Sequence, residues 1–240
     1  MGGMERKGNT VAQGDVTEMF DAIVPVYDRL NTVMTLGRDA RWRRRAAQAT
    51  GLQPGERALD VACGTGKLAA ELAAMVGPFG LVEGVDLSSA MIARSTAAHR
   101  ALVQMHFQVA DALALPFADA TFDAATIAFG LRNLPDFAAG FREMARVVRP
   151  GGTVVCLELS LPPRRRWARA FHGTFRRLAP AAARLIGGRV AAYGYLPASL
   201  DGFPSAEALA ETMRSVGLVE VRFRRLSTGV VALHRGLVAG

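Results

Sequence analysis

Short apolar runs alternate with longer amphipathic stretches through the middle of the chain. The runs are bounded by glycine, proline and polar residues, which is typical of buried β-strands. They predict strands at residues 58–62, 81–85, 105–109, 122–128 and 153–158. Helical stretches begin between them at Lys67, Ser88 and Asp136. Strand alternating with helix implies right-handed crossovers and a parallel sheet covered on both faces.

Two helices are predicted ahead of this alternating region. The pattern favours one helix at residues 16–27, and residues 38–50 form a second one that is strongly basic. Gly51 and the pair Pro54-Gly55 end the second helix before the first strand. Farther along, Pro150-Gly151-Gly152 is predicted to end the helix that precedes the fifth strand.

The end of the chain has a different pattern. A helix is predicted at residues 205–216, with Ser205 as its N-cap. Two strands follow, at residues 219–226 and 230–234, and only Ser227-Thr228-Gly229 separates them. A gap this short that contains glycine is typical of a hairpin, so the last strand is expected to run antiparallel to its neighbours.

Composition places the chain among globular proteins. Of its 240 residues, 50% are hydrophobic and 21% charged, enough for one large domain or a domain with a modest appendage. No apolar run reaches the ~18 residues that a spanning helix requires, so a soluble chain is expected. The polar start lacks the apolar stretch of a secretory signal, which favours the cytoplasm. Cys63 and Cys156 have no histidines at metal-ligand spacing, so neither a disulfide framework nor a metal site is predicted.

The positive charge of the chain is concentrated in one segment. The formal net charge is +8, yet residues 161–200 hold eight arginines and no acid, and the remaining 21 basic residues equal the 21 acids. Because this segment carries the whole excess, no nucleic-acid partner is expected. Trp167, Phe171, Phe175 and Leu178 would form one face of a helix there, and basic amphipathic helices with aromatics are typical of membrane surfaces. Alternatively, this face packs onto the domain and helps to cover the substrate.

A glycine-rich loop joins the first predicted strand to the next helix. Residues 60–67 read Asp-Val-Ala-Cys-Gly-Thr-Gly-Lys, and Gly64, Gly66 and Ala69 form a G-x-G-x-x-A pattern. Asp86 follows Gly66 by 20 residues, at the end of the second strand, where a carboxylate accepts hydrogen bonds from ribose hydroxyls. The pattern alone suits a dinucleotide as well as S-adenosylmethionine (SAM), and it also occurs in loops that bind no ligand.

Three acids lie at or near the ends of three of the predicted strands. Asp60, Asp86 and Asp111 would face one crevice, because ligands of open parallel sheets bind outside the carboxyl ends of the strands. Three carboxylates disfavour a pyrophosphate and suit a cation such as SAM, whose own carboxylate can rest on the helix N-terminus after Gly66. Asp111 would accept from the adenine amino group and the Ala112 backbone would contact the ring. In the plainer interpretation, Asp86 caps a helix and Asp111 shapes a turn.

Several longer motifs carry a family resemblance from about residue 19 to residue 236. The glycine loop and an Arg-Pro-Gly-Gly motif are shared with many methyltransferases, whereas Phe-Gly-Leu-Arg-Asn at 129–133 and Ala-Leu-His-Arg-Gly at 232–236 are far more specific. Together with the Tyr-Asp-Arg-Leu-Asn motif at 27–31, these residues resemble the menaquinone/ubiquinone biosynthesis C-methyltransferases.

This resemblance implies the class I SAM-dependent methyltransferase fold. That fold is an α/β, Rossmann-like domain whose seven-stranded sheet is mostly parallel, with an antiparallel last strand. The family's cofactor positions fall on Thr65, Asp86 and the pair Asp111-Ala112. The implied activity is methylation of a ring carbon of a polyprenylated quinol, as in demethylmenaquinol to menaquinol. Residues 191–195 depart from the family pattern, at the surface that would contact the quinone.

The residues after the fourth strand are the main catalytic candidates. A ring carbon becomes nucleophilic when a neighbouring hydroxyl ionises, but a phenol has a pKa near ~10, so the site must favour the phenolate. We expect Arg132 to lower this pKa, with Asn133 as a hydrogen-bond donor and Tyr27 orienting the quinol hydroxyl. Alternatively, Arg132 pairs with an acid, Asn133 shapes the turn and Tyr27 packs against the lid. His172 and His234 are expected to be structural.

The chain is expected to divide into four parts. Residues 1–50 form a helical lid, 51–160 the SAM-binding core, 161–204 a basic insertion facing substrate and membrane, and 205–240 the helix and hairpin that complete the sheet. The expected partner is a membrane-resident polyprenyl quinol, met by transient contact at the inner face of the membrane, and a homodimer is compatible with this picture. Three other functions stay open: methylation of another lipid or small aromatic acceptor, nicotinamide-dependent oxidoreduction, and lipid binding without catalysis.

Overall fold

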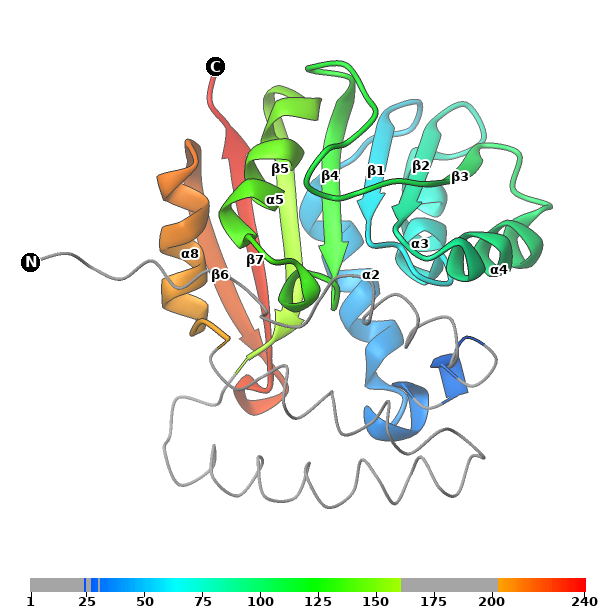
Figure 1. Cartoon of the computed structure of the whole chain (residues 1–240), viewed down its shortest axis with the longest axis horizontal. Coiled ribbons are helices and arrows are strands. Elements are labelled where there is room, and N and C mark those ends of the chain that lie inside the picture. The colour runs from blue at the N-terminus through cyan, green and yellow to red at the C-terminus, as the bar shows by residue number, and fades with distance from the viewer. Residues whose placement is uncertain (1–23, 25–26, 30, 161–202) are drawn as a thin grey trace, which may run out of the picture.

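Seven strands form one mixed sheet in the order β3-β2-β1-β4-β5-β7-β6 (Figure 1). The computed structural model describes residues 24, 27–29, 31–160 and 203–240. Strand β7 pairs antiparallel with both of its neighbours, and the other pairings are parallel. The strands are β1 (Arg57–Val61), β2 (Leu81–Asp86), β3 (Met105–Val109), β4 (Phe122–Ala128), β5 (Val148–Leu159), β6 (Leu218–Leu226) and β7 (Val231–Val238).

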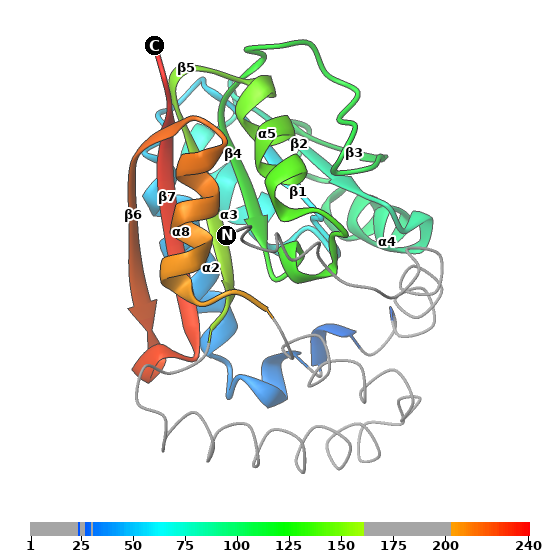
Figure 2. The same ribbon diagram turned by 60° about the vertical axis from the view of Figure 1, so that its left-hand side comes forward.

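Helices cover both faces of this sheet (Figures 1 and 2). α2 and α3 pack on one face, α5 and α8 pack on the other, and α4 packs against β2 and β3 near the edge. Successive side chains of a strand serve different layers, so Ala58 packs with the α2–α3 cluster while Leu59 packs with the α5–α8 cluster. The helices are α2 (Arg38–Thr50), α3 (Lys67–Val76), α4 (Ser89–His99), α5 (Phe137–Val147) and α8 (Ala206–Ser215).

Three elements have the bounds that the sequence predicts. They are the helix at residues 38–50 and the strands at 105–109 and 122–128. The C-terminal hairpin is also confirmed, because a single 3-10 turn over Ser227–Gly229 joins two antiparallel strands. The predicted seven-stranded, mostly parallel sheet with an antiparallel last strand is therefore confirmed.

Two predicted boundaries are wrong. β5 begins at Val148, directly after α5, so Pro150-Gly151-Gly152 lies inside a strand instead of ending the helix. The strand accommodates these residues because its pairing with β4 shifts register there and Gly151 adopts a φ of 76°. β7 runs to Val238, beyond the predicted end at residue 234, because its later residues pair with residues 153–155 of β5 and with the first residues of β6.

The starts of the helices differ in a way that bears on the ligand site. Ser88, Asp136 and Ser205 each accept a hydrogen bond from a backbone amide three residues further on, which stabilises a helix start by about 1 kcal/mol. α3 instead begins after Gly66, which has a φ of 77° and gives no side-chain cap. The first amides of α3 therefore lie at the end of the glycine loop without a side-chain acceptor from the cap position.

The structure describes only part of the predicted lid and little of the predicted insertion. The predicted helix at 16–27 lies outside the described residues except for residues 24 and 27, and so does the arginine-rich segment up to residue 202. Residues 27–29 and 31–34 are helical. α2 buries Trp42 and Ala46 against the sheet, so this part of the predicted lid belongs to the helical layer of the core.

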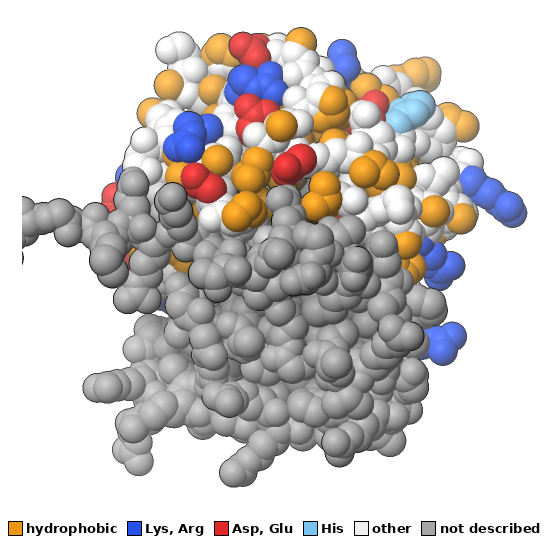
Figure 3. Space-filling model, viewed as in Figure 1, with side chains coloured by type: hydrophobic (Ala, Val, Ile, Leu, Met, Phe, Trp, Pro, Cys, Tyr) orange, Lys and Arg blue, Asp and Glu red, His pale blue; other side chains and the backbone are white. Residues whose placement is uncertain are grey.

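Among the described residues, no helix combines the length and the apolarity needed to cross a bilayer. On the described part of the face seen in Figure 3, basic side chains lie beside acidic ones, among hydrophobic and other atoms.

Candidate active site

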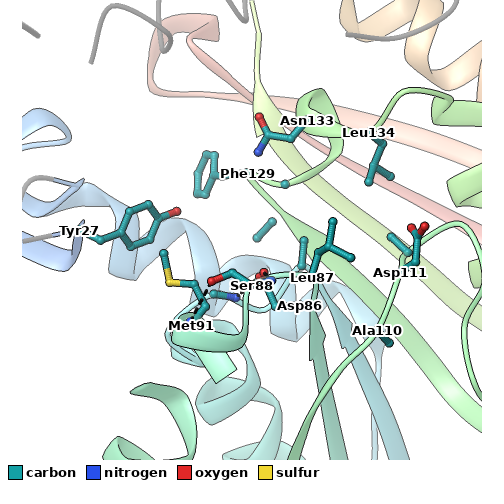
Figure 4. Close-up of a pocket in the computed structure, with 15 residues that line it drawn as sticks. Tyr27, Asp86, Leu87, Ser88, Met91, Ala110, Asp111, Phe129, Asn133 and Leu134 are labelled. Carbon is teal, nitrogen blue, oxygen red and sulfur yellow. Dashed lines mark hydrogen bonds between the residues drawn. The ribbon is translucent and has the colours of Figure 1, made fainter. Parts of the chain in front are cut away.

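A pocket opens at the carboxyl ends of β1, β2, β3 and β4 (Figure 4). It holds about 730 Å³ of empty space when its open mouth toward solvent is included. The loops after the four strands form most of the wall, and the N-terminal segment adds one side chain. The lining residues are Tyr27, Ala62, Gly64, Asp86, Leu87, Ser88, Met91, Ala110, Asp111, Ala112, Ala128, Phe129, Gly130, Asn133 and Leu134.

The glycine loop turns through left-handed backbone conformations at the floor of this pocket. Ala62, Gly64 and Gly66 have φ values of 51°, 54° and 77°. A side chain at Gly66 would also place its Cβ 2.8 Å from the ring of His99, so only glycine fits. Gly64 lines the pocket as predicted, whereas Gly66 lies behind it and sets the entry into α3.

Asp86 holds two loops together while it faces the pocket. Its Oδ2 accepts the amide of Gly64 at 2.9 Å, and its Oδ1 accepts the amide of Ser88 at 3.0 Å. A carboxylate oxygen can accept more than one hydrogen bond, so an oxygen that holds a loop amide can also accept a ligand hydroxyl. The cap of α4 is Ser88, not Asp86, because the Ser88 hydroxyl accepts the Met91 amide at 3.0 Å.

Asp111 and Ala112 form the opposite wall. Asp111 Oδ1 accepts the amide of Leu113 at 2.9 Å, and both predicted residues line the pocket. The described lining residues thus include two carboxylates, Asp86 and Asp111, and neither lysine nor arginine. Such a pocket favours a cationic, hydroxyl-bearing ligand over a pyrophosphate.

Asp60 does not join the other two acids. It lies inside β1, is 1% exposed, and accepts the Thr126 hydroxyl at 2.8 Å, while its Oδ2 has no hydrogen-bond partner among the described residues. Burial raises the pKa of Asp60 to about 7, against the opposing effects of Thr126 and the Arg43 guanidinium. The expectation that three carboxylates face one crevice is therefore wrong. Asp60 comes one residue before the end of its strand, where the neighbouring strand and the loop above enclose its side chain.

Arg132 lies behind the pocket wall. It is 5% exposed and donates from one guanidinium nitrogen to Glu158 Oε1 at 2.7 Å and to the Phe129 carbonyl at 2.5 Å. Its backbone amide reaches Glu158 Oε2 at 3.2 Å. Arg132 does not line the pocket, contrary to expectation, because its guanidinium is held in a buried ion pair with Glu158. Glu158 gives no signal in the sequence beyond its place near the end of β5.

Three other side chains face the cavity from the N-terminal segment and from the loop after β4. Tyr27 points its hydroxyl toward the cavity from the N-terminal segment, with Phe129 and Asn133 across from it (Figure 4). Phe129 has a φ of 57°, rare for a bulky residue and a sign of a constrained turn. Tyr27 and Asn133 were predicted to lie here. The apolar residues Phe129 and Leu134 escape sequence reasoning because nothing in their residue types marks a site.

Thr65 and His234 also have definite partners. The Thr65 hydroxyl donates to Asp28 Oδ1 at 2.9 Å, and Thr65 is not among the residues that line the pocket. His234 is buried, and its Nε2 lies 2.8 Å from the Ala206 carbonyl oxygen. Burial lowers the pKa of His234, so this geometry fits the structural role expected of it. His172 lies outside the described residues.

Comparisons with known proteins agree with this geometry. Residues 7–238 match the model of the ubiE/COQ5 methyltransferase family. A demethylmenaquinone methyltransferase of Thermus thermophilus is 44% identical over 220 residues, covering 91% of this chain and 99% of the relative. One from Desulfitobacterium hafniense is 38% identical over 226 residues, covering 92% and 88%.

The fold is also found in solved structures. A SAM-dependent methyltransferase from Thermotoga maritima superposes with a TM-score of 0.64 at 18% identity, covering 92% of this chain and 99% of that one. At this identity the likeness concerns the fold alone. The comparisons lend no support to the nicotinamide-dependent oxidoreductase that the glycine loop left open.

Proposed function

The chain belongs to the ubiE/COQ5 methyltransferase family, a family of SAM-dependent methyltransferases, and we propose that its methyl acceptor is a ring carbon of a polyprenylated quinol. Demethylmenaquinol, converted to menaquinol, is the acceptor that the names of its relatives favour. The observation that supports SAM as the methyl donor is the pocket, whose described lining includes two carboxylates and no lysine or arginine.

The residues of the pocket fit SAM. Asp86 would accept hydrogen bonds from the ribose hydroxyls, and Asp111 with the Ala112 backbone would hold the adenine ring. Gly64, which lines the pocket without a side chain, lets a ligand approach the loop backbone closely. When bound, SAM supplies a methyl group on a positively charged sulfur, which a carbon nucleophile attacks. The two carboxylates attract this positively charged ligand and would repel an anionic one.

The acceptor side suits a flat, largely apolar ring. Phe129 and Leu134 provide apolar surface, while Asn133 and Tyr27 are the polar groups on that side. We assign to Asn133 and Tyr27 hydrogen bonds to the quinol hydroxyl, which favour its ionised form and so make the adjacent ring carbon nucleophilic. Arg132 acts through the loop that it anchors to Glu158, rather than by touching the acceptor.

A polyprenyl acceptor resides in the bilayer, so we also propose transient contact with the membrane surface. The support is the sequence of residues 161–200, with eight arginines and no acid. Each basic residue near an anionic leaflet contributes about 1 kcal/mol, so a few of them give reversible docking. Co-sedimentation with anionic but not neutral vesicles is expected, and equal recovery with both would contradict the electrostatic contact.

Mass spectrometry of quinones tests the proposed function. The protein is incubated with methyl-labelled SAM and either reduced demethylmenaquinone or its demethylated benzoquinol counterpart, each with a short prenyl chain. We expect one labelled methyl group on the naphthoquinol ring, and no product from Asp86→Ala. Asp119→Ala, which removes an exposed carboxylate paired with Arg146, serves as the control.

The outcomes separate the alternatives. Label on the benzoquinol alone would change the acceptor ring, and label on neither ring would overturn the quinol as acceptor. Binding of a nicotinamide dinucleotide in preference to SAM would overturn the methyl-transfer function itself.

A further inference from the structure

Asp28 joins the N-terminal segment to the floor of the SAM pocket. Its Oδ1 accepts the hydroxyl of Thr65 at 2.9 Å and lies 3.2 Å from Nζ of Lys67. Thr65 belongs to the glycine loop, and Lys67 is the first residue of α3. A single carboxylate oxygen thus contacts both the loop and the helix that follows it.

The partner on the loop is itself held firmly. Thr65 is 5% exposed, and its carbonyl oxygen lies 3.0 Å from Nε2 of His99, at the end of α4. The His99 ring fills the space beside Gly66 so closely that a Cβ there would lie 2.8 Å from it. Asp28 is therefore attached to a well-packed part of the domain.

The residue before Asp28 is the one that reaches the pocket. Tyr27 lines the cavity, and its ring carbon Cε1 lies 3.9 Å from where a Cβ on Gly64 would be. Both residues lie in one short helical stretch, so fixing Asp28 fixes the Tyr27 ring across the glycine loop. In Figure 4, Tyr27 faces the cavity from the side opposite Asp111.

We propose that Asp28, Thr65 and Lys67 form a latch that holds Tyr27 across the pocket and thereby slows the release of SAM. We call these three residues the Asp28 latch. Asp28 is a positioning residue, because its contacts are with the loop and α3 while Tyr27 closes the pocket. The latch rests on the proposed function only in taking SAM as the ligand, and it is independent of the acceptor.

The exposure of the latch predicts how it responds to salt. The side chains of Asp28 and Lys67 are 32% and 35% exposed, so ions reach this pair. Exposed ion pairs weaken with ionic strength, whereas the hydrogen bond from Thr65 to Asp28 depends on it less. Release of SAM should therefore quicken with salt in the wild-type chain, and Lys67→Met should remove the part of that dependence that comes from the latch, leaving the part that comes from the carboxylates of the pocket.

Stopped-flow measurement of SAM dissociation, with excess competitor, tests the latch. We expect about a tenfold faster rate for Asp28→Asn and a several-fold increase for Thr65→Val and for Lys67→Met, with association changed less than threefold. The control is Glu71→Gln, which removes another partly exposed ion pair, that of Glu71 with Arg44. Its dissociation rate should match that of the wild type.

Hydrogen exchange on the ligand-free protein supplies a second readout. Amides of residues 27–29 and 31–34 should exchange faster in the Asp28 and Thr65 variants, while those of α3 and α4 stay protected. If Asp28→Asn lowers the melting temperature too far, Thr65→Val and Lys67→Met carry the test.

Each outcome decides the proposal. Dissociation rates within twofold of wild type in all three variants would overturn the latch, even if thermal stability falls, because the contacts would then be only a structural clip. Loss of quinol methylation with the predicted rate changes intact would count against the proposed acceptor alone. Absence of SAM binding by the wild-type chain would overturn the proposed donor and the latch together.

Discussion

Charged side chains lie differently on the two sides of the pocket. They face the cavity at the ends of β2 and β3, and they are buried and paired at the ends of β4 and β5. Asp86, the last residue of β2, and Asp111, just after β3, line the cavity, and backbone amides hold them in place. Beyond β4 and at the end of β5, Arg132 and Glu158 are both at least 95% buried and bond to each other at 2.7 Å. One side presents negative charge to a ligand, whereas the other neutralises its charge behind the wall.

This difference matches the two molecules that must meet in the pocket. A cationic donor gains from carboxylates that are already oriented, since no reorganisation is needed when it binds. A prenylated aromatic ring gains from apolar surface, and an unpaired charge facing it would have to be desolvated at a cost of several kcal/mol. Beyond β4, the uncharged residues Phe129, Asn133 and Leu134 accordingly line the cavity, while the charged pair of Arg132 and Glu158 is buried behind them.

The largest expected effect comes from breaking the buried pair. Glu158→Leu leaves the Arg132 guanidinium buried without its carboxylate, and removal of one partner of such a pair costs about 3–5 kcal/mol. Urea unfolding should show this loss in the free energy of unfolding. The loop of Phe129 should also lose its shape, so turnover falls while SAM affinity changes little.

The double variant Glu158→Leu/Arg132→Met is the matched control. Replacing both charges by apolar groups should restore most of the stability, because it removes the uncompensated charge. If the double variant is as unstable as the single one, the pair is not the cause. Recovered stability without recovered turnover would show that the pair also positions the acceptor loop.

On the other side of the comparison, Asp86→Ala should act on binding. The change removes hydrogen bonds to a ligand and the contacts with the Gly64 and Ser88 amides. We expect SAM affinity to fall about 100-fold, or about 2.7 kcal/mol, by calorimetry. The exposed carboxylate Asp119 offers the control, and Asp119→Ala should bind SAM as the wild type does. A loss below threefold in Asp86→Ala would mean that the carboxylate serves only the loops.

Sequence reasoning succeeded where a residue's neighbours along the chain decide its surroundings. Asp86 and Asp111 follow strand ends, and a parallel sheet brings such ends together, so the cofactor side was predictable. The hairpin was predictable for the same reason, from a short turn that contains Gly229.

It failed where pairing across the sheet decides the outcome. Whether Arg132 meets a ligand or an acid depends on Glu158, 26 residues away on a neighbouring strand. Asp60 differs from Asp86 only in standing one residue inside its strand, which puts Thr126 against it. The Phe129 wall and the Asp28 contact with Thr65 need the folded loops to be seen at all.

Asp60 lies on the same side of the sheet edge as Asp86 but is buried, so it tests what burial does to an acid there. Its pKa of about 7 in the folded chain lies above its ordinary value of 3.8, so the folded chain binds the proton more tightly between these values. The free energy of unfolding should therefore fall as pH rises from about 4 to about 7 and then level off. Between pH 5 and pH 8 this group should contribute a decrease of roughly 2 to 3 kcal/mol.

Asp60→Asn should flatten this part of the pH profile, since the amide carries no titrating proton. Urea unfolding of both proteins at several pH values measures the difference. Asp119→Asn, at an exposed position, should leave the profile unchanged. A slope that survives in Asp60→Asn would assign the proton to another group.

The smallest effect should come from Asn133, and its sign is the informative part. Asn133→Ala removes one hydrogen bond to the quinol oxygen, so kcat should fall about tenfold, or about 1.4 kcal/mol, with SAM affinity within twofold of wild type. Asn133→Asp keeps the shape but places a negative charge near an oxygen that must ionise, so its kcat should be lower still. A general base at this position would give the reverse order, because a carboxylate accepts the hydroxyl proton and an alanine does not. Measuring kcat for the three chains with saturating SAM therefore distinguishes a neutral donor, which fits a side whose charges are turned inward, from a charged base, which does not.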